Sequence, residues 1–533
     1  MTDYFISPRR RKEREAITNP GVLVMCISRE VLAVGMLLVT LWLTGCGPTS
    51  EEPSQSSAQP TAPRRQEVSI APSVSDREVK KPEKPRETVP PVRTPSEDKS
   101  PPRRTFADLL NQPTDAIDRW MPHIPRVKVD KAKVKAAGIR RIEGRYLTLY
   151  TDFPPDRSTN ALPAVFDQAV EQWQRYFGVA PSKVAKWHWT GFLIHDRELF
   201  RRVGLLPGNL PPFQHAFCLN TDFWVYEKPS EYFNRHQVLH EGTHCFMNAM
   251  FGACGPPWFM EGTAELLATH RVSDDRAKVK LNQVPRDRDQ TPLWGRIKLV
   301  KDAVAAGRGR SLKRVLNYRF DAYLETEPYA WSWAAALFLD RHPKYGPTFR
   351  QLHRYVLTGD LTRRFMEKVG DDWPALERQW NVFLDDLDYG CDVKAMLIDP
   401  TPGRPLDGGR VKVDVSARRG WQNSGLRVEQ GKTYRLKAEG RYQIGDKPKI
   451  WWCEPNGVTI RYYRGRPLGM LLAMVLPDDA PIGKVPTMPE PIEVGLGTTL
   501  VPKKTGTLYF RINESPADWN DNAGELSVEI QAE

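Results

Sequence analysis

The sequence lacks an apolar run long enough to cross a membrane as a helix. Its apolar stretch near the start, Val31–Thr44, reads VLAVGMLLVTLWLT and falls short of the about 20 residues that such a helix needs. Arg29 precedes it, and its length is typical of the hydrophobic core of a signal peptide. The alternative is a short anchor that is never cleaved. In either case we expect the chain to be exported.

The apolar stretch ends in LTGC, Leu43–Cys46. This resembles the lipobox of bacterial lipoproteins, in which the chain is cut before the Cys and the Cys is then lipidated. The resemblance implies a signal peptide over residues 1–45 and a lipid anchor on Cys46, which makes a membrane one partner of the chain. Gly47, rather than Asp, after this Cys favours the outer membrane. We therefore expect a membrane-anchored lipoprotein at the periplasmic face or the cell surface.

Large apolar side chains are almost absent between the anchor and about Arg104. The segment 46–104 consists mainly of Pro, Ser, Thr, Lys, Arg and Glu, and the whole chain has 46 prolines. Such a composition cannot bury enough surface to offset the entropy lost on ordering. We expect a disordered tether that spans roughly 40 Å as a coil and up to about 180 Å when extended.

A stripe of basic residues interleaved with aromatics is also missing, although the net charge is +12. The Lys and Arg residues are scattered among Asp and Glu, which is not the distribution of a nucleic-acid-binding surface. We therefore expect a solvated, mildly basic surface and no nucleic-acid partner.

Cysteine is scarce, with seven in the chain. Two belong to the targeting segment. The other five are an odd number, so at least one of them stays free or pairs elsewhere. Some of them could form disulfides in an oxidising compartment, but the spacing leaves the connectivity open. The five are Cys218, Cys245, Cys254, Cys391 and Cys453.

The remaining residues predict an α+β protein. Between 105 and 398, strand-like runs such as RYLTLYTDF (145–153) alternate with amphipathic patterns such as LPAVFDQAVEQWQRYFGV (162–179). HAFCLN and DFWVYE predict a hairpin or two edge strands, and a helix is expected over 230–250. From about 405 to 533, short alternating runs between Gly, Asn, Asp and Pro are typical of an antiparallel sandwich.

The expected helix over 230–250 contains HEGTH, with His240, Glu241 and His244. Residues four apart lie on one face of a helix, so the two imidazoles point to the same place. Two neutral imidazoles suit zinc, and Glu241 beside them suits a general base. Such a motif would arise by chance in about one of a hundred such sequences, so a third ligand is needed to support it.

Two candidates for that ligand follow in PPWFMEGTAELLATH, residues 256–270. Glu261 and Glu265 are one helical turn apart on a second expected helix. Here the sequence resembles the gluzincin metallopeptidases over about 145–388, because WFMEG matches the setting in which their second helix supplies a Glu to zinc. The resemblance implies Glu261 as the ligand. Glu265 is either the fallback ligand or an acceptor that orients a ligand imidazole.

Three protein ligands leave one zinc position open for water, which is the catalytic arrangement. The expected reaction is hydrolysis of a peptide bond in a peptide or protein substrate, with Glu241 taking a proton from the zinc-held water. Tyr329, which opens a later helix, is either an oxyanion donor or a core residue. No GxMEN-type segment precedes the motif, which favours an endopeptidase over an aminopeptidase.

The C-terminal part resembles the calcium-dependent, galactose-binding sandwich of the PA-I-type lectin over about 421–530, most closely in NESPADWNDNAG, residues 513–524. The resemblance implies a calcium site that holds a carbohydrate. The implied ligands are Glu514, Asp518, Asp521 and Asn522. Two features depart from it: Ile444 stands where the lectin has a Tyr, and the sugar-contacting His and Gln are not found in VTIRYYRGRPLG. The alternative is a solvated turn in an accessory sandwich.

Together these patterns predict a lipid-anchored zinc metallopeptidase with a gluzincin-like domain and a lectin-like sandwich. The alternative is a cell-surface protein that binds a carbohydrate or protein ligand and keeps a structural zinc site. Glu241 favours the enzyme, because a binding protein has no use for a base beside its metal.

Overall fold

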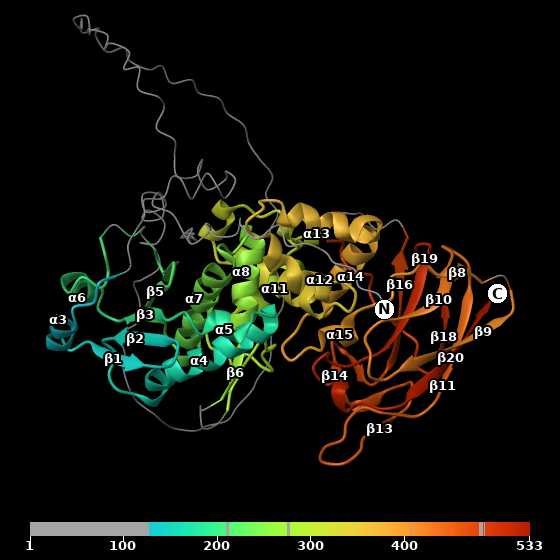
Figure 1. The fold of residues 1–533 in the computed structure, drawn as a ribbon. Helices are drawn as coiled ribbons and strands as arrows, with labels where there is room; N and C mark the ends of the chain where they lie inside the picture. The colour runs from blue at the N-terminus through green and yellow to red at the C-terminus, as the bar shows by residue number, and fades with distance from the viewer. Residues whose placement is uncertain are drawn as a thin grey trace, which may run out of the picture. The chain divides into compact units, whose positions relative to one another are not determined.

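The computed structural model describes residues 127–208, 210, 213–273, 278–406, 408–478, 483 and 485–533. The expected signal peptide, Cys46 and the tether lie outside these residues. The described residues belong to one compact unit, in which helices around a mixed sheet are followed by an antiparallel sandwich (Figure 1). The predicted α+β class is confirmed. Among the helices of the described part, none combines the length and apolar character needed to span a membrane.

A five-stranded sheet supports the helical region. Its strand order is β1-β2-β3-β5-β4, with parallel pairing in the centre and antiparallel pairing at both edges. The expected hairpin forms the edge pair β4–β5 and turns at Asn220, whose φ is 55°. The strands are β1 (Arg140–Glu143), β2 (Leu147–Thr151), β3 (Trp189–Ile194), β4 (Ala216–Leu219) and β5 (Asp222–Tyr226).

Helix α7 (Glu231–Phe251) carries HEGTH and packs against strands β4 and β5 of the sheet and against α8. It begins at Ser230, whose hydroxyl caps the backbone N–H of Phe233, and it ends at Gly252, whose φ is 86°. On one side it packs against α4 (Arg157–Phe177). Gly242 makes this approach close, because a Cβ there would lie 2.5 Å from the ring of Phe166.

Helix α8 (Pro257–Ala268) is buried along its whole length. It begins at Pro257, because proline fits the first turn of a helix. It packs between α7 and α11 (Glu327–Arg341) (Figure 1). A helix that is covered on all sides holds its side chains in fixed positions, and both Glu261 and Glu265 belong to it.

Shorter elements complete the helical region. Helix α12 is followed directly by a 3₁₀ helix, Leu352–Tyr355. The helices are α3 (Lys131–Ala136), α5 (Pro181–Val184), α6 (Arg197–Arg202), α9 (Arg296–Ala305), α10 (Leu312–Val315), α12 (Gly346–Gln351), α13 (Leu361–Val369), α14 (Trp373–Asp386) and α15 (Val393–Met396), and a small ladder joins β6 (His270–Val272) to β7 (Val279–Leu281).

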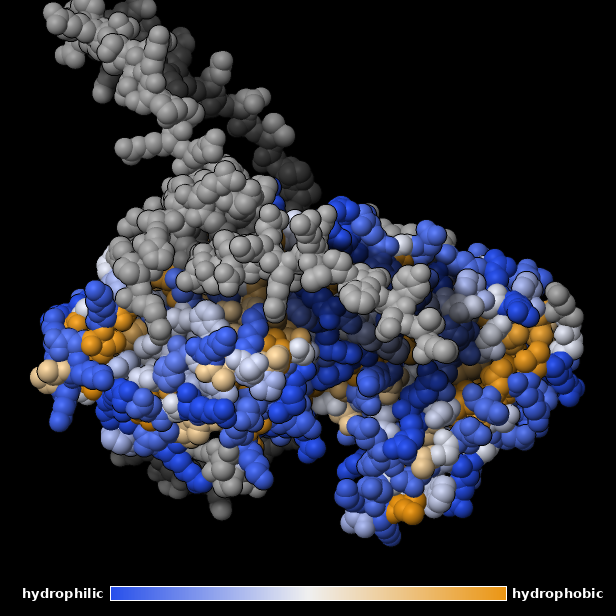
Figure 2. All heavy atoms as spheres, viewed as in Figure 1, coloured by the Kyte–Doolittle hydropathy of each residue, from blue (hydrophilic) through white to orange (hydrophobic). Residues whose placement is uncertain are grey.

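The sandwich consists of two sheets with strand orders β17-β16-β19-β10-β8 and β18-β11-β20-β9. Strand β11 alternates buried and exposed residues along its length, as one wall of a sandwich should. On the visible face of the molecule, Figure 2 shows mostly hydrophilic side chains, with hydrophobic ones gathered over the sandwich strands. The main strands are β8 (Arg404–Pro405), β9 (Arg410–Ser416), β10 (Gln422–Val428), β11 (Tyr434–Glu439), β16 (Leu471–Pro477), β17 (Ile492–Glu493), β18 (Gly497–Leu500), β19 (Gly506–Ile512) and β20 (Glu525–Ala532).

A buried ion pair and a small hydrophobic cluster join the sandwich to the helices. Nη1 of Arg511 on β19 lies 2.8 Å and 3.0 Å from the two carboxylate oxygens of Asp386 at the end of α14. Both side chains are almost fully buried. The cluster comprises Val382, Ile398, Trp421, Leu472, Met474, Leu476 and Tyr509.

Candidate metal centre

Three ligand atoms from α7 and α8 converge inside the helical region. Nε2 of His240 and Nε2 of His244 lie 3.1 Å apart. Oε2 of Glu261 lies 3.1 Å from the first and 3.6 Å from the second. All three side chains are buried. The structure thus brings together the three residues expected to hold zinc.

The spacing of these atoms fits a tetrahedral metal. Ligand bonds of about 2.0–2.1 Å at tetrahedral angles place neighbouring ligand atoms about 3.3 Å apart. The Glu261 side chain is also in the right protonation state. Burial raises its pKa, but the charge of His244 and hydrogen bonds from both imidazoles outweigh burial and bring the pKa to about 2. The donor set is therefore two imidazoles and one carboxylate, which suits zinc.

Glu241 is buried beside these ligands and keeps one oxygen unpaired. Its Oε2 has no hydrogen-bond partner among the described residues. Burial is the largest influence on its pKa, which rises to about 8 even though the charges of His244 and Lys228 lower it. A carboxyl group whose pKa is close to neutral suits a general base.

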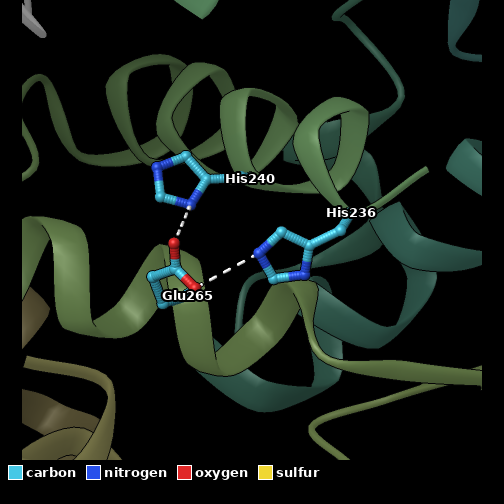
Figure 3. A group of neighbouring side chains, drawn as sticks. All are labelled: His236, His240 and Glu265. Carbon is cyan, nitrogen blue, oxygen red and sulfur yellow. Dashed lines mark hydrogen bonds and ion pairs between the residues drawn. The ribbon is translucent and has the colours of Figure 1, made fainter. Parts of the chain in front are cut away.

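A second group of side chains lies on the other side of His240 (Figure 3). Oε1 of Glu265 is 3.6 Å from Nδ1 of His240, and its Oε2 is 3.2 Å from Nε2 of His236. Arg296 donates to both oxygens of Glu265, over 2.8 Å and 3.2 Å. Trp294 donates to Oε2 over 3.3 Å. Glu265 is therefore the hub of a buried network.

Arg296 decides between the two roles expected for Glu265. Burial raises the pKa of Glu265, but the charges of Arg296 and His236 lower it well below its usual value. The carboxylate already has a guanidinium as its counter-ion, and a divalent metal bound there would lie beside that positive charge. The geometry favours Glu265 as an acceptor that orients the His240 imidazole.

Tyr329 lies in the first turn of α11 and borders the centre. Its ring centroid is 6.4 Å from that of His240, and Cζ of Arg296 is 5.7 Å from the ring centroid. The side chain is half-buried. This position allows the expected role of oxyanion donor, because the ring stands beside the ligands rather than deep in the core.

Several residues of the centre were not expected from the sequence. A local pattern could have pointed to His236, because it precedes His240 by the same four residues that separate His240 from His244. No local pattern points to Trp294 or Arg296. Lys228 is also buried, and no described residue accepts a hydrogen bond from its ammonium group; burial lowers its pKa to about 8.

The five cysteines of the described residues are buried and unpaired. Cys245 follows the ligand His244 on α7, and its Sγ lies 2.7 Å from Sγ of Cys218 on β4. The Cys245 side chain is turned away from the ligand face of α7, since one helical step turns it by about 100° from His244.

The residues expected to hold calcium lie in the loop before β20. Glu514 and Asn522 are buried and joined by a hydrogen bond of 2.5 Å, whereas Asp518 is exposed. Asp521 Oδ1 and Asn522 Oδ1 have no partner among the described residues. Sets of three His, Cys, Asp or Glu side chains with ligand atoms within 4.8 Å of one another occur, in the described ranges, at α7–α8 alone. The three loop carboxylates do not form such a set.

No protein-family model matches the chain, and no curated protein matches it. Among solved structures it is similar to the PllA-like lectin domain at the N-terminus of EclA, with 23% identity over 23% of this chain and 95% of that chain, at a TM-score of 0.17. It is also similar to the IMPa metallopeptidase from Pseudomonas aeruginosa, with 10% identity over 72% of this chain and 46% of that chain, at a TM-score of 0.15. The same metallopeptidase in complex with T-antigen gives 11% identity, with the same coverage and TM-score. The chain thus spans less than half of the length of that enzyme, and these TM-scores carry no argument about function.

Proposed function

We propose that the chain is a zinc-dependent hydrolase, and specifically a peptidase. The observation that carries the proposal is the convergence of His240, His244 and Glu261 at ligand spacing, with an unpaired oxygen of Glu241 beside them. A structural metal site needs the first three residues but not the fourth. The unpaired carboxyl oxygen therefore favours the hydrolase over a binding protein with a structural zinc.

Each residue of the centre then has a role. Zinc held there would polarise the scissile carbonyl and make a water more acidic. Glu241 accepts the proton of the attacking water on Oε2 and passes it to the leaving amine. Glu265 faces Nδ1 of His240 across 3.6 Å, and its negative charge favours the tautomer with the proton on Nδ1, which leaves the Nε2 lone pair for the metal. Tyr329 donates a hydrogen bond to the oxyanion.

Cleavage of unfolded casein by the full chain tests this proposal. We expect cleavage that 1,10-phenanthroline abolishes and that added zinc restores. Cleavage that persists in the chelator would assign the activity to another mechanism. Zinc binding without cleavage of casein or of a broad peptide library would leave the binding protein as the better account.

A second function is proposed for the loop before β20, which would bind a cation such as calcium. Two buried oxygens, Asp521 Oδ1 and Asn522 Oδ1, are left without donors there. Burial raises the pKa of Glu514 to about 8, and the charges of Asp518 and Asp521 add to the rise. A hard cation would satisfy these oxygens and compensate the charge.

Calcium should raise the unfolding temperature of the wild type but not of Asp521→Asn, and equal shifts would contradict this assignment. Galactose is the first carbohydrate to test.

Membrane attachment through a lipid on Cys46 is the third part of the proposal. It rests on LTGC and on the apolar stretch before it. Radiolabelled palmitate should be incorporated by the wild type expressed in a bacterium and not by Cys46→Ser. Labelling of both forms would contradict the proposal.

A further inference from the structure

A polar pocket opens on the helical region and shares no residue with the metal centre. Its volume is about 510 Å³, within the range typical of small-molecule sites. The walls come from β6, the C-terminal end of α11, α12, and the start of α15. Nothing in the proposed hydrolysis uses this pocket.

The pocket gathers positive charge from four separate elements. Arg271 comes from β6, Arg341 from the end of α11, Arg350 from α12 and Lys394 from α15. The carboxylates that line the pocket are Asp340 and Asp392. Four cations therefore face two anions, and the pocket has an excess of about two positive charges.

Asp340 is buried beneath the pocket and fixes two of these cations. Its Oδ2 accepts from Arg341 over 2.8 Å, and its Oδ1 accepts from Arg350 over 3.0 Å. Tyr176 and Asn282 each donate a further hydrogen bond to the same carboxylate over 3.1 Å. One fully satisfied carboxylate thus holds two guanidinium groups in place, and their remaining donors are pre-oriented.

Three of the four cations in the pocket keep N–H donors that have no acceptor in the described part of the chain. Nη1 of Arg350 donates to both the carbonyl oxygen and Oδ1 of Asp340, and Nη2 and Nε of Arg350 have no acceptor among the described residues. Arg271 uses Nη2 on the carbonyl of Val284, while its Nε is buried and unpaired. The ammonium of Lys394 is also without an acceptor among these residues. Burial and the nearby charge of Arg286 lower the pKa of Arg271, so the protein supplies too little negative charge around it.

We propose that this pocket binds a phosphate monoester, such as a phosphorylated sugar. A phosphoryl group carries a charge of about −1.5 to −2 at neutral pH and three acceptor oxygens. Its charge matches the excess of the pocket, and its oxygens match free donors that arrive from three directions. Arg350 offers its unused Nε–Nη2 edge to two oxygens, and Arg271 and Lys394 supply further positive charge. The pocket volume leaves room for the group that the phosphate esterifies.

Calorimetric titration of the full chain tests this proposal, with glucose 6-phosphate, glycerol 3-phosphate and inorganic phosphate as probes at constant ionic strength. The first probe represents a soluble sugar ester, and the second represents the polar part of phosphatidic acid, the phospholipid whose phosphate is a monoester. Arg271→Gln and Lys394→Gln remove cations that hold no carboxylate in the fold, so both variants should remain folded. Lys368→Gln, an exposed lysine on α13, removes the same charge outside the pocket.

We expect one of the two esters to bind more tightly than inorganic phosphate, with a dissociation constant that rises about tenfold in each pocket variant and stays unchanged in Lys368→Gln. The ester that binds more tightly identifies the source of the ligand. Absence of saturable binding by all three probes would overturn the proposal. Equal weakening in all three variants would also overturn it, because the effect would then reflect net charge alone. These outcomes do not depend on zinc or on peptide hydrolysis.

Discussion

Arg296 holds Glu265 with two hydrogen bonds, and Glu265 in turn faces Nδ1 of the zinc-ligand candidate His240. This link connects α9 to α8 and α7. The positive charge of Arg296 is separated from the metal position by two side chains, those of Glu265 and His240. The metal centre is therefore a buried, charge-balanced network as well as a set of three ligands.

The Arg296–Glu265 link predicts a loss of metal affinity when Arg296 is replaced. In Arg296→Met the buried carboxylate loses its counter-ion, and it can no longer hold the His240 imidazole in one orientation. We expect zinc affinity to fall about 10–100-fold, as is usual when such supporting groups are removed. Competition with a chromogenic chelator measures this. Lys298→Met, an exposed residue of the same helix, serves as the control, and equal affinities in the two variants would refute the link.

Gly242 within HEGTH is predicted to be required for helix packing. A Cβ at this position would lie 2.5 Å from Phe166 and 2.9 Å from Trp173. Gly242→Ala should therefore destabilise the fold by about 1–3 kcal/mol, as overpacking in a core does. Urea unfolding measures the change. Gly208→Ala is the matched control, because a Cβ there meets nothing within 4 Å. Stability of Gly242→Ala equal to that of the control would show that α4 and α7 can separate without penalty.

The ion pair between Arg511 and Asp386 predicts strong coupling between the sandwich and the helices. Arg511→Met leaves Asp386 buried with only the longer contact to Arg464, at 3.5 Å. Removal of one partner from a buried pair costs about 3–5 kcal/mol. Urea unfolding should show this loss, whereas Arg435→Met, which breaks an exposed pair with Glu533, should change little. A small effect of Arg511→Met would mean that the hydrophobic cluster alone joins the two regions.

Cys218 and Cys245 are predicted to form a disulfide when the chain meets an oxidant. Their sulfur atoms are neighbours at 2.7 Å, and a small movement brings them to the bond length of about 2.05 Å. Mass spectrometry of a proteolytic digest should find the two peptides linked, with the loss of two hydrogen atoms. Recovery of both cysteines as free thiols after treatment with oxidised glutathione would contradict the prediction.

Local patterns in the sequence predict part of the centre, and only the fold supplies the rest. The four-residue spacing on one expected helix is enough to find His240 and His244. Periodicity leaves Glu261 and Glu265 as alternatives, and the resemblance of WFMEG to the gluzincin motif is what favours Glu261. Arg296 reaches Glu265 from 31 residues away, and that contact depends on how α9 packs. The phosphate pocket was not expected either, because its cations are spread over residues 271–394 and no local pattern joins them.

Helices α7 and α8 are proposed to build a catalytic zinc site. The most direct test measures zinc content and peptide hydrolysis together, on the full chain as wild type, Glu241→Gln and His244→Gln. We expect one zinc per chain in the wild type and in Glu241→Gln, no tightly bound zinc in His244→Gln, and hydrolysis by the wild type alone. Hydrolysis by Glu241→Gln at the wild-type rate, or a wild type that binds no zinc, would contradict it.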